Sequence, residues 1–303
     1  MSTARYITPQ SLAGIGSTKL RARNVLEGVL AGMHRSPHRG ASVEFAEYKE
    51  YSPGDEIRHI DWRAWGRTDR YYVKQYEDET NTRGFLLLDG SGSMDFASEG
   101  LPTKWTWAST LVATLAWLLL RQGDAPGLLV FGERPGAWLV PSSRRTQLDD
   151  LCRLLDAREV RGGTNTEAAL RQIAERTRFR SIVVLVSDML DPASEALRVG
   201  RILRRRGVEV ALFHVLDPAE LTLPWEGLAR FEGLEGEGDL LVDPDDIRHA
   251  YLETMGRHLA SIEEDCRRGD LEYFRVRTDQ PVEEAVLRFL RARARGSKTG
   301  GRR

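Results

Sequence analysis

The feature that most constrains the fold is an alternation of short apolar runs with segments of helical length between residues 84 and 216. The apolar runs cover 84–88, 127–131, 137–140, 181–187 and 208–215, and helical patterns fill 105–120, 146–155, 166–177 and 193–206. Short, continuous apolar runs are typical of strands that are buried on both faces. Strands that alternate with helices predict an α/β fold: a doubly wound, mainly parallel sheet with helices on both faces.

The chain on either side of this region has a different pattern. Residues 1–83 are polar, aromatic and irregular apart from a predicted helix at 20–33, while 221–238 is a Gly- and Glu-rich connection. A helix is expected at 245–268, a strand at 271–276 and a helix at 282–294. We therefore predict an N-terminal segment (1–83) that packs on the core, a site-bearing domain (84–219), a C-terminal extension (220–294) and a disordered tail (295–303). Within the first segment, Trp62 and Trp65 favour a structural brace over a docking surface, because aromatic residues near a core supply buried area.

Composition narrows the class of protein. The 44 basic and 45 acidic residues nearly cancel, which argues against a dedicated nucleic-acid binder. The two cysteines form no disulfide framework, and the first ten residues contain no apolar stretch typical of a signal peptide. The uncharged run from Trp105 to Leu120 is shorter than the roughly 20 apolar residues of a membrane span, so it predicts a buried helix. We expect a cytoplasmic protein without membrane insertion.

Polar clusters follow two of the predicted strands. Asp89-Gly-Ser91-Gly-Ser93 comes after the first strand, Asp188 follows the strand at 181–187, and Thr164 lies in a Gly-Gly-Thr turn before a helix. Because the carboxyl ends of parallel strands share one edge of a sheet, these side chains can meet there. Hydroxyl and carboxylate oxygens suit Mg²⁺, with Mn²⁺ or Ca²⁺ as alternatives. The predicted metal ligands are Asp89, Ser91, Ser93, Thr164 and Asp188, although the first cluster alone could equally cap a helix.

The same pattern resembles the metal-ion-dependent adhesion site of von Willebrand factor A domains. One departure is that Met189 follows Asp188, where many such domains have glycine. The stretches 47–62 and 73–77, the apolar run that ends at Asp89, and 273–278 further resemble the bacterial family catalogued as domain of unknown function 58. That resemblance implies an adaptor for a MoxR-type AAA+ ATPase. The ligand set implies that an acidic residue of a client or partner protein fills an open position on the metal.

Two enzymatic functions compete with this binding function. Ser91, Asp188 and His214 follow the chain order of the α/β-hydrolase triad, but the flanks lack the Gly-x-Ser-x-Gly motif and His214 lies inside an apolar run. Phosphoryl transfer on Asp89 lacks the carboxylate expected two residues later as proton donor, since Ser91 stands there. No Gly-Lys-Ser/Thr phosphate loop is present. We predict a non-enzymatic, metal-dependent binding protein.

Overall fold

The structure is a computed structural model that describes residues 8–34, 48–50, 72–74, 82–158, 160–177, 181–191, 193–236 and 238–299. The chain divides into two compact units, one of residues 1–37 with 82–303 and one of residues 38–81. In the second unit, β1 (Tyr48–Glu50) pairs antiparallel with β2 (Tyr72–Lys74). The predicted brace residues Trp62 and Trp65 lie outside the described residues.

A six-stranded sheet organises the first unit, in the order β10-β7-β6-β3-β4-β5. Neighbouring strands are parallel except for β4 and β5, which are antiparallel. Starting from the β5 edge, this is the 3-2-1-4-5-6 order of doubly wound dinucleotide-binding folds, so the predicted fold class is confirmed. The strands are β3 (Arg83–Asp89), β4 (Ala125–Phe131), β5 (Pro135–Leu139), β6 (Ser181–Ser187), β7 (Glu209–Leu216) and β10 (Glu272–Arg277).

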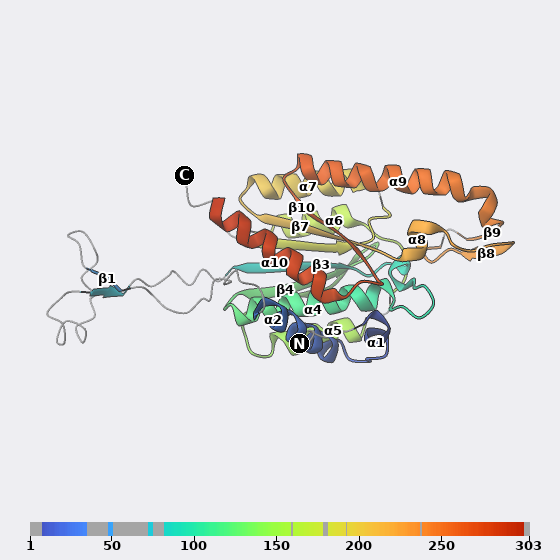
Figure 1. Cartoon of the computed structure of the whole chain (residues 1–303). Coiled ribbons are helices and arrows are strands. Elements are labelled where there is room, and N and C mark those ends of the chain that lie inside the picture. The colour runs from blue at the N-terminus through green and yellow to red at the C-terminus, as the bar shows by residue number, and fades with distance from the viewer. Residues whose placement is uncertain are drawn as a thin grey trace. The chain divides into compact units, whose positions relative to one another are not determined.

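Helices cover both faces of the sheet (Figure 1). Successive side chains of β3 point to opposite faces, so Leu86 and Leu88 belong to one apolar core while Phe85 and Leu87 belong to the other. The first core is covered by α2 (Thr18–His34), α4 (Lys104–Arg121), α5 (Gln147–Asp156) and α10 (Val282–Thr299). The second is covered by α6 (Thr166–Ala174), α7 (Ala193–Arg205) and α9 (Pro244–Arg268).

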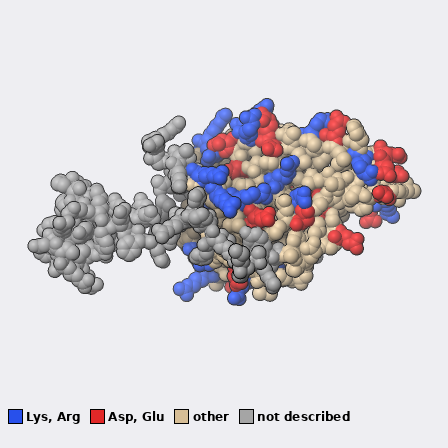
Figure 2. Space-filling view, viewed as in Figure 1, with Lys and Arg blue, Asp and Glu red and all other residues tan. Residues whose placement is uncertain are grey.

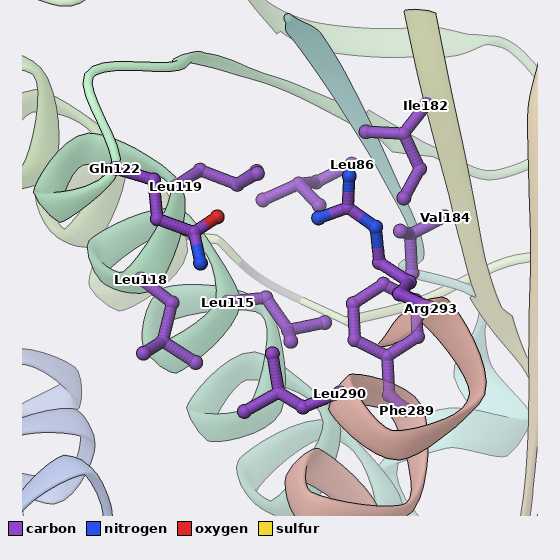
Figure 3. A pocket seen from close by; sticks show the side chains of 10 residues that line it. All are labelled: Leu86, Leu115, Leu118, Leu119, Gln122, Ile182, Val184, Phe289, Leu290 and Arg293. Carbon is purple, nitrogen blue, oxygen red and sulfur yellow. The ribbon is translucent and has the colours of Figure 1, made fainter. Parts of the chain in front are cut away.

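The helix α4 lies between the sheet and α2 and is buried along most of its length. It begins where the hydroxyl of Thr103 accepts a hydrogen bond from the backbone N–H of Thr106 at 3.0 Å. Figure 3 shows leucines of α4 meeting side chains of α10 and of the sheet: Leu86, Leu115, Leu118, Leu119, Ile182, Val184, Phe289 and Leu290. The predicted buried helix is therefore present, and among the described residues no helix has the length and apolar character needed to cross a membrane.

Three features differ from the expected organisation. The N-terminal segment predicted as 1–83 is divided between the two units, because α2 packs on α4 and α10. The helix α10 continues to Thr299, so the prediction of a disordered tail beginning at residue 295 is wrong for residues 295–299. The stretch 221–238, expected to be a connection, contains the end of the short helix α8 (Pro218–Thr222) and the first strand of a hairpin, in which β8 (Ala229–Glu232) pairs antiparallel with β9 (Asp239–Val242).

Charged side chains are distributed unevenly on the face shown in Figure 2. Basic side chains gather around α10, and both signs mix toward the end that carries the β8–β9 hairpin. The helix α10 contributes Arg288, Arg291, Arg293 and Arg295. Arg293 lies over the ring of Phe289 and pairs with Glu209 at 3.1 Å, so part of this basic charge is engaged within the fold.

Candidate metal centre

The site begins where β3 and β6 end side by side. These strands are parallel with Leu88 opposite Val186, so the next residues, Asp89 and Ser187, end the two strands side by side. The hydroxyl of Ser187 donates a hydrogen bond to Oδ2 of Asp89 at 2.7 Å. Both side chains are fully buried, which places a carboxylate at the carboxyl edge of the sheet without contact to bulk water.

The loop after β3 turns its hydroxyls back toward Asp89. The backbone N–H of Ser91 donates to Oδ1 of Asp89 at 3.0 Å, and the hydroxyls of Ser91 and Ser93 lie 3.1 Å apart. A short 3-10 turn, η2 (Gly92–Asp95), follows. The loop is fixed by the N–H of Gly90, which donates to the carbonyl of Phe131 on β4 at 2.7 Å.

A second loop, before α6, contributes Thr164. Its hydroxyl lies 3.2 Å from each carboxylate oxygen of Asp89. Asn165 begins α6 by accepting a hydrogen bond from the N–H of Ala168 at 2.9 Å, which fixes Thr164 just before the helix. The two loops are joined by a 2.7 Å hydrogen bond from the N–H of Gly92 to the carbonyl of Gly162. The structure thus brings Asp89, Ser91, Ser93 and Thr164 together.

Asp188 lies beside this group with a different set of contacts. Its Oδ2 accepts a hydrogen bond from the ammonium of Lys104 at 2.7 Å, and both side chains are fully buried. The other oxygen, Oδ1, is buried and has no hydrogen-bond partner within the described part of the chain. Lys104 also pairs with Glu220 of α8 at 2.5 Å. Asp188 therefore offers one free oxygen and shares the other with an internal cation.

The electrostatics of the site are dominated by buried carboxylates. Burial, and then the charge of Asp188, raise the pKa of Asp89 to about 7, although hydrogen bonds from Ser187 and Ser91 oppose this shift. Burial lowers the pKa of Lys104, but the charges of Asp188 and Glu220 outweigh it and hold that pKa above its usual value. When all are ionised, the carboxylates of Asp89, Asp188 and Glu220 carry three negative charges, and the ammonium of Lys104, which pairs with Asp188 and Glu220, carries one positive charge. The excess of two negative charges equals the charge of one divalent cation.

The donor set fits a hard cation. Serine and threonine hydroxyls, a carboxylate and an unpaired carboxylate oxygen are ligands that Mg²⁺, Mn²⁺ and Ca²⁺ accept. Within the described ranges, no three His, Cys, Asp or Glu side chains form a group able to hold a metal. Three of the five predicted ligands are hydroxyls, and the other two are carboxylates.

The loop after β6 has Met189 at the position where glycine is common in the motif that this site resembles. Met189 adopts a φ of 53°, the left-handed backbone that favours glycine, and its N–H donates to the hydroxyl of Ser187 at 2.9 Å. Its side chain is fully buried in the second core. Methionine thus takes the conformation that glycine would adopt, and the strain is offset by packing.

His214 on β7 lies behind the site in an environment unsuited to a general base. Its Nε2 contacts the backbone carbonyl of Asp188 at 2.8 Å and its Nδ1 contacts the hydroxyl of Tyr273 at 3.0 Å. Burial lowers its pKa to about 4. In the described part of the chain no hydrogen bond joins His214 to Ser91 or to the carboxylate of Asp188, so the geometry gives no support to a hydrolase triad.

Four residues at or near the site were absent from the predicted ligand set: Lys104, Ser187, Glu220 and Glu235. Lys104 stands at the edge of an apolar helix, where a lysine is expected to be solvated, and only its burial reveals its role. Ser187 could have been predicted as a site residue, because it is a polar residue at the end of a buried strand. Glu235 belongs to the stretch predicted as a connection (221–238), and Glu220 directly precedes that stretch. No local pattern places either residue near the site.

Sequence comparison identifies the family. Residues 47–261 match the family described as "Protein of unknown function DUF58". The chain belongs to the DUF58 family. An uncharacterized protein of Mycobacterium bovis is 26% identical over 299 residues, which cover 96% of this chain and 92% of that protein. An uncharacterized protein of Mycobacterium tuberculosis matches this DUF58 chain equally well, with 26% identity over 299 residues.

Solved structures with similar folds share little sequence with this DUF58 chain. BatB from Bacteroides thetaiotaomicron is 18% identical, covers 71% of this chain and 99% of its own, and has a TM-score of 0.49. The SpRpn10 VWA domain is 11% identical, covers 68% of this chain and 93% of its own, and has a TM-score of 0.39. Scores this low do not bear on function, and the fold class rests on the strand order and the layers described above.

Proposed function

We propose that this DUF58 protein is a non-enzymatic adaptor that binds a protein partner through one divalent cation, with Mg²⁺ as the expected ion. Asp89, Ser91, Ser93 and Thr164 would hold the ion, with Asp188 acting directly or through bound water. The cation would supply a Lewis-acidic position for a carboxylate of the partner. The observation that carries the proposal is that hydroxyls from both loops and from the end of β6 surround one fully buried carboxylate, Asp89.

The charge of the site supports binding of a divalent cation. A buried carboxylate without a cationic partner is unfavourable in a low-dielectric environment, and the ion pairs of the described residues include none with Asp89. Lys104 compensates Asp188 and Glu220 only in part. A divalent cation would restore neutrality, while the neutral hydroxyls of Ser91, Ser93 and Thr164 would leave the ion electrophilic toward an outside carboxylate.

The resemblance to proteins that act with MoxR-type AAA+ ATPases supports the choice of partner, with complex assembly or maturation as the expected task. The test is a pull-down with the purified MoxR-type ATPase of the source organism, in Mg²⁺ and in EDTA. We expect retention only in Mg²⁺ with the wild type, and loss with Ser91→Ala. The matched control is Thr114→Val, which removes a buried hydroxyl from α4. Equal retention in Mg²⁺ and EDTA would contradict metal-dependent binding.

The hydrolase alternative has its own test. A fluorophosphonate probe labels an activated serine, and we expect no labelling of Ser91, because its hydroxyl contacts Ser93 and not an imidazole. Covalent modification of Ser91 that is lost in His214→Ala would overturn the proposal of a non-enzymatic protein.

A further inference from the structure

The loop that joins β8 to β9 lies directly against the first loop of the metal centre. A Cβ atom added to Gly92 would stand 1.9 Å from the backbone carbonyl oxygen of Leu234, so only glycine permits this approach. The loop is closed by a 3.0 Å hydrogen bond from the N–H of Gly233 to the carbonyl of Gly238. Because Gly92 has no side chain, the backbone of the β8–β9 loop can pack directly against the loop that carries Ser91 and Ser93.

This contact brings the carboxylate of Glu235 to the mouth of the site. Its Oε1 lies 3.4 Å from the backbone N–H of Ser93, and its Oε2 would lie 3.9 Å from a Cβ added to Gly163. The two oxygens therefore lie between the loop that carries Ser93 and the loop that carries Thr164. In the same candidate site, Oδ1 of Asp188 is buried without a hydrogen-bond partner in the described part of the chain.

We propose that Glu235 is an internal ligand, which occupies the position on the bound cation that a partner's carboxylate would otherwise take. This inference rests on the proposed function, because it requires a cation at the site. The β8–β9 hairpin then acts as a cap, and an acidic partner binds by replacing Glu235. A carboxylate of the same chain binds at high effective concentration. A partner's carboxylate can therefore replace it only if the partner gains affinity from further contacts.

Electrostatics couple the cap to the cation. Without metal, the position that Glu235 occupies beside Ser93 is disfavoured by repulsion from a cluster that holds more negative charges than positive ones. With a divalent ion in place, the same carboxylate is attracted. Metal binding should therefore hold the hairpin more firmly in this closed position, and by thermodynamic reciprocity a hairpin that closes well should strengthen metal binding.

The β8–β9 hairpin is held on the domain by few apolar contacts, so it can be displaced. Its β9 leucines, Leu240 and Leu241, are 57% and 64% exposed, so little apolar surface holds it on the domain. Trp225 anchors its base through edge contacts with Phe96 and Phe231, at ring-centroid distances of 6.3 Å and 5.6 Å. Two-stranded hairpins are marginally stable by themselves, so a partner that replaces Glu235 need not disrupt the core.

Water counting on a bound Mn²⁺ ion tests the assignment. Mn²⁺ replaces Mg²⁺ at oxygen sites, and the relaxation rate of water protons reports how many exchanging waters the ion holds. We expect the Mn²⁺ complex of Glu235→Gln to show about one more inner-sphere water than the wild type and to bind Mn²⁺ roughly tenfold more weakly, because ligand charge sets affinity. Added acetate should remove that extra water from the variant and leave the wild type unchanged.

Two further variants distinguish the effect of the Glu235 carboxylate from the effect of the hairpin's position. Glu232→Gln removes an exposed charge from the same hairpin and should match the wild type. Gly92→Ala keeps every carboxylate but drives a methyl group against the Leu234 carbonyl, so it should reproduce the extra water of Glu235→Gln. If the wild type binds Mn²⁺ and Glu235→Gln has the same water count and affinity, the internal ligand is wrong while the metal site stands. If the wild type binds no Mn²⁺, the proposed function itself fails.

Discussion

The ammonium of Lys104 and the carboxylate of Asp188 form a 2.7 Å ion pair in which both side chains are fully buried. The three acidic residues of the site, Asp89, Asp188 and Glu220, therefore have different partners. Asp188 and Glu220 share an internal cation, whereas the hydrogen bonds that Asp89 accepts from the described residues come from hydroxyls and from the backbone N–H of Ser91. Lys104 thus neutralises one part of the acidic cluster, and the proposed divalent ion would neutralise the other part.

Replacing Lys104 should therefore be strongly destabilising. Lys104→Met keeps the length of the side chain and leaves two buried carboxylates without their cation, so we expect a loss of about 3 to 5 kcal/mol in the free energy of unfolding. Urea denaturation measures this loss. Lys19→Met is the control, because Lys19 pairs with Asp149 on the surface and its removal should change stability by less than about 1 kcal/mol. Similar losses in both variants would show that the buried pair does not have this role.

Asp89→Asn should remove metal binding and stabilise the metal-free protein. The pKa of Asp89 is raised from 3.8 to about 7, so its ionisation disfavours the folded state increasingly as pH rises between these values, and fully above them. In EDTA at pH 8 we expect Asp89→Asn to be more stable by about 1 to 3 kcal/mol, with a smaller difference at pH 5. Mg²⁺ should then stabilise the wild type and leave the variant unchanged. A destabilised Asp89→Asn protein in EDTA at pH 8 would contradict this account of the charge.

Met189→Gly tests whether packing offsets backbone strain beside Asp188. Glycine relieves about 1 kcal/mol or more of strain at a φ of 53°, but it removes a fully buried side chain whose loss costs about 2 to 5 kcal/mol. We expect a net destabilisation of about 2 kcal/mol by thermal or urea unfolding, since the packing loss is the larger effect. Met189→Leu, which conserves volume, should cost less. A glycine variant as stable as the wild type would mean that the side chain contributes little.

Both cysteines should be unreactive in the folded protein. Burial raises the pKa of Cys152 and of Cys266 to about 12, so the thiolate is scarce at pH 8. A colorimetric disulfide reagent should detect neither thiol in native protein and both after unfolding in urea. Fast labelling of either cysteine under native conditions would show that its helix opens locally.

The fold was predictable because its strands carry strong local signals. The β-branched run at 181–187 coincides with β6, and the uncharged run at 105–120 lies within α4, since burial on both sides selects continuous apolar sequence. The β8–β9 hairpin gave no such signal. Its strands are short, partly exposed and flanked by glycines, so their sequence is that of a connection.

The site was predictable only in its local part. Asp89, Ser91 and Ser93 occupy a single loop, and the strand order brings Thr164 to it, as the parallel sheet implies. Lys104 and Glu235 reach the site through tertiary packing, from the start of a helix and from the tip of a hairpin. No spacing in the sequence encodes those contacts, because they depend on how separate elements meet.

Isothermal titration of Mg²⁺ into metal-stripped protein is the most direct measurement of the central claim. We predict that the wild type binds one ion per chain, that Asp149→Asn, which alters a carboxylate of α5 outside the site, binds equally, and that Asp89→Asn binds none. Absence of binding by the wild type, or equal binding by Asp89→Asn, would contradict a metal centre at this edge of the sheet.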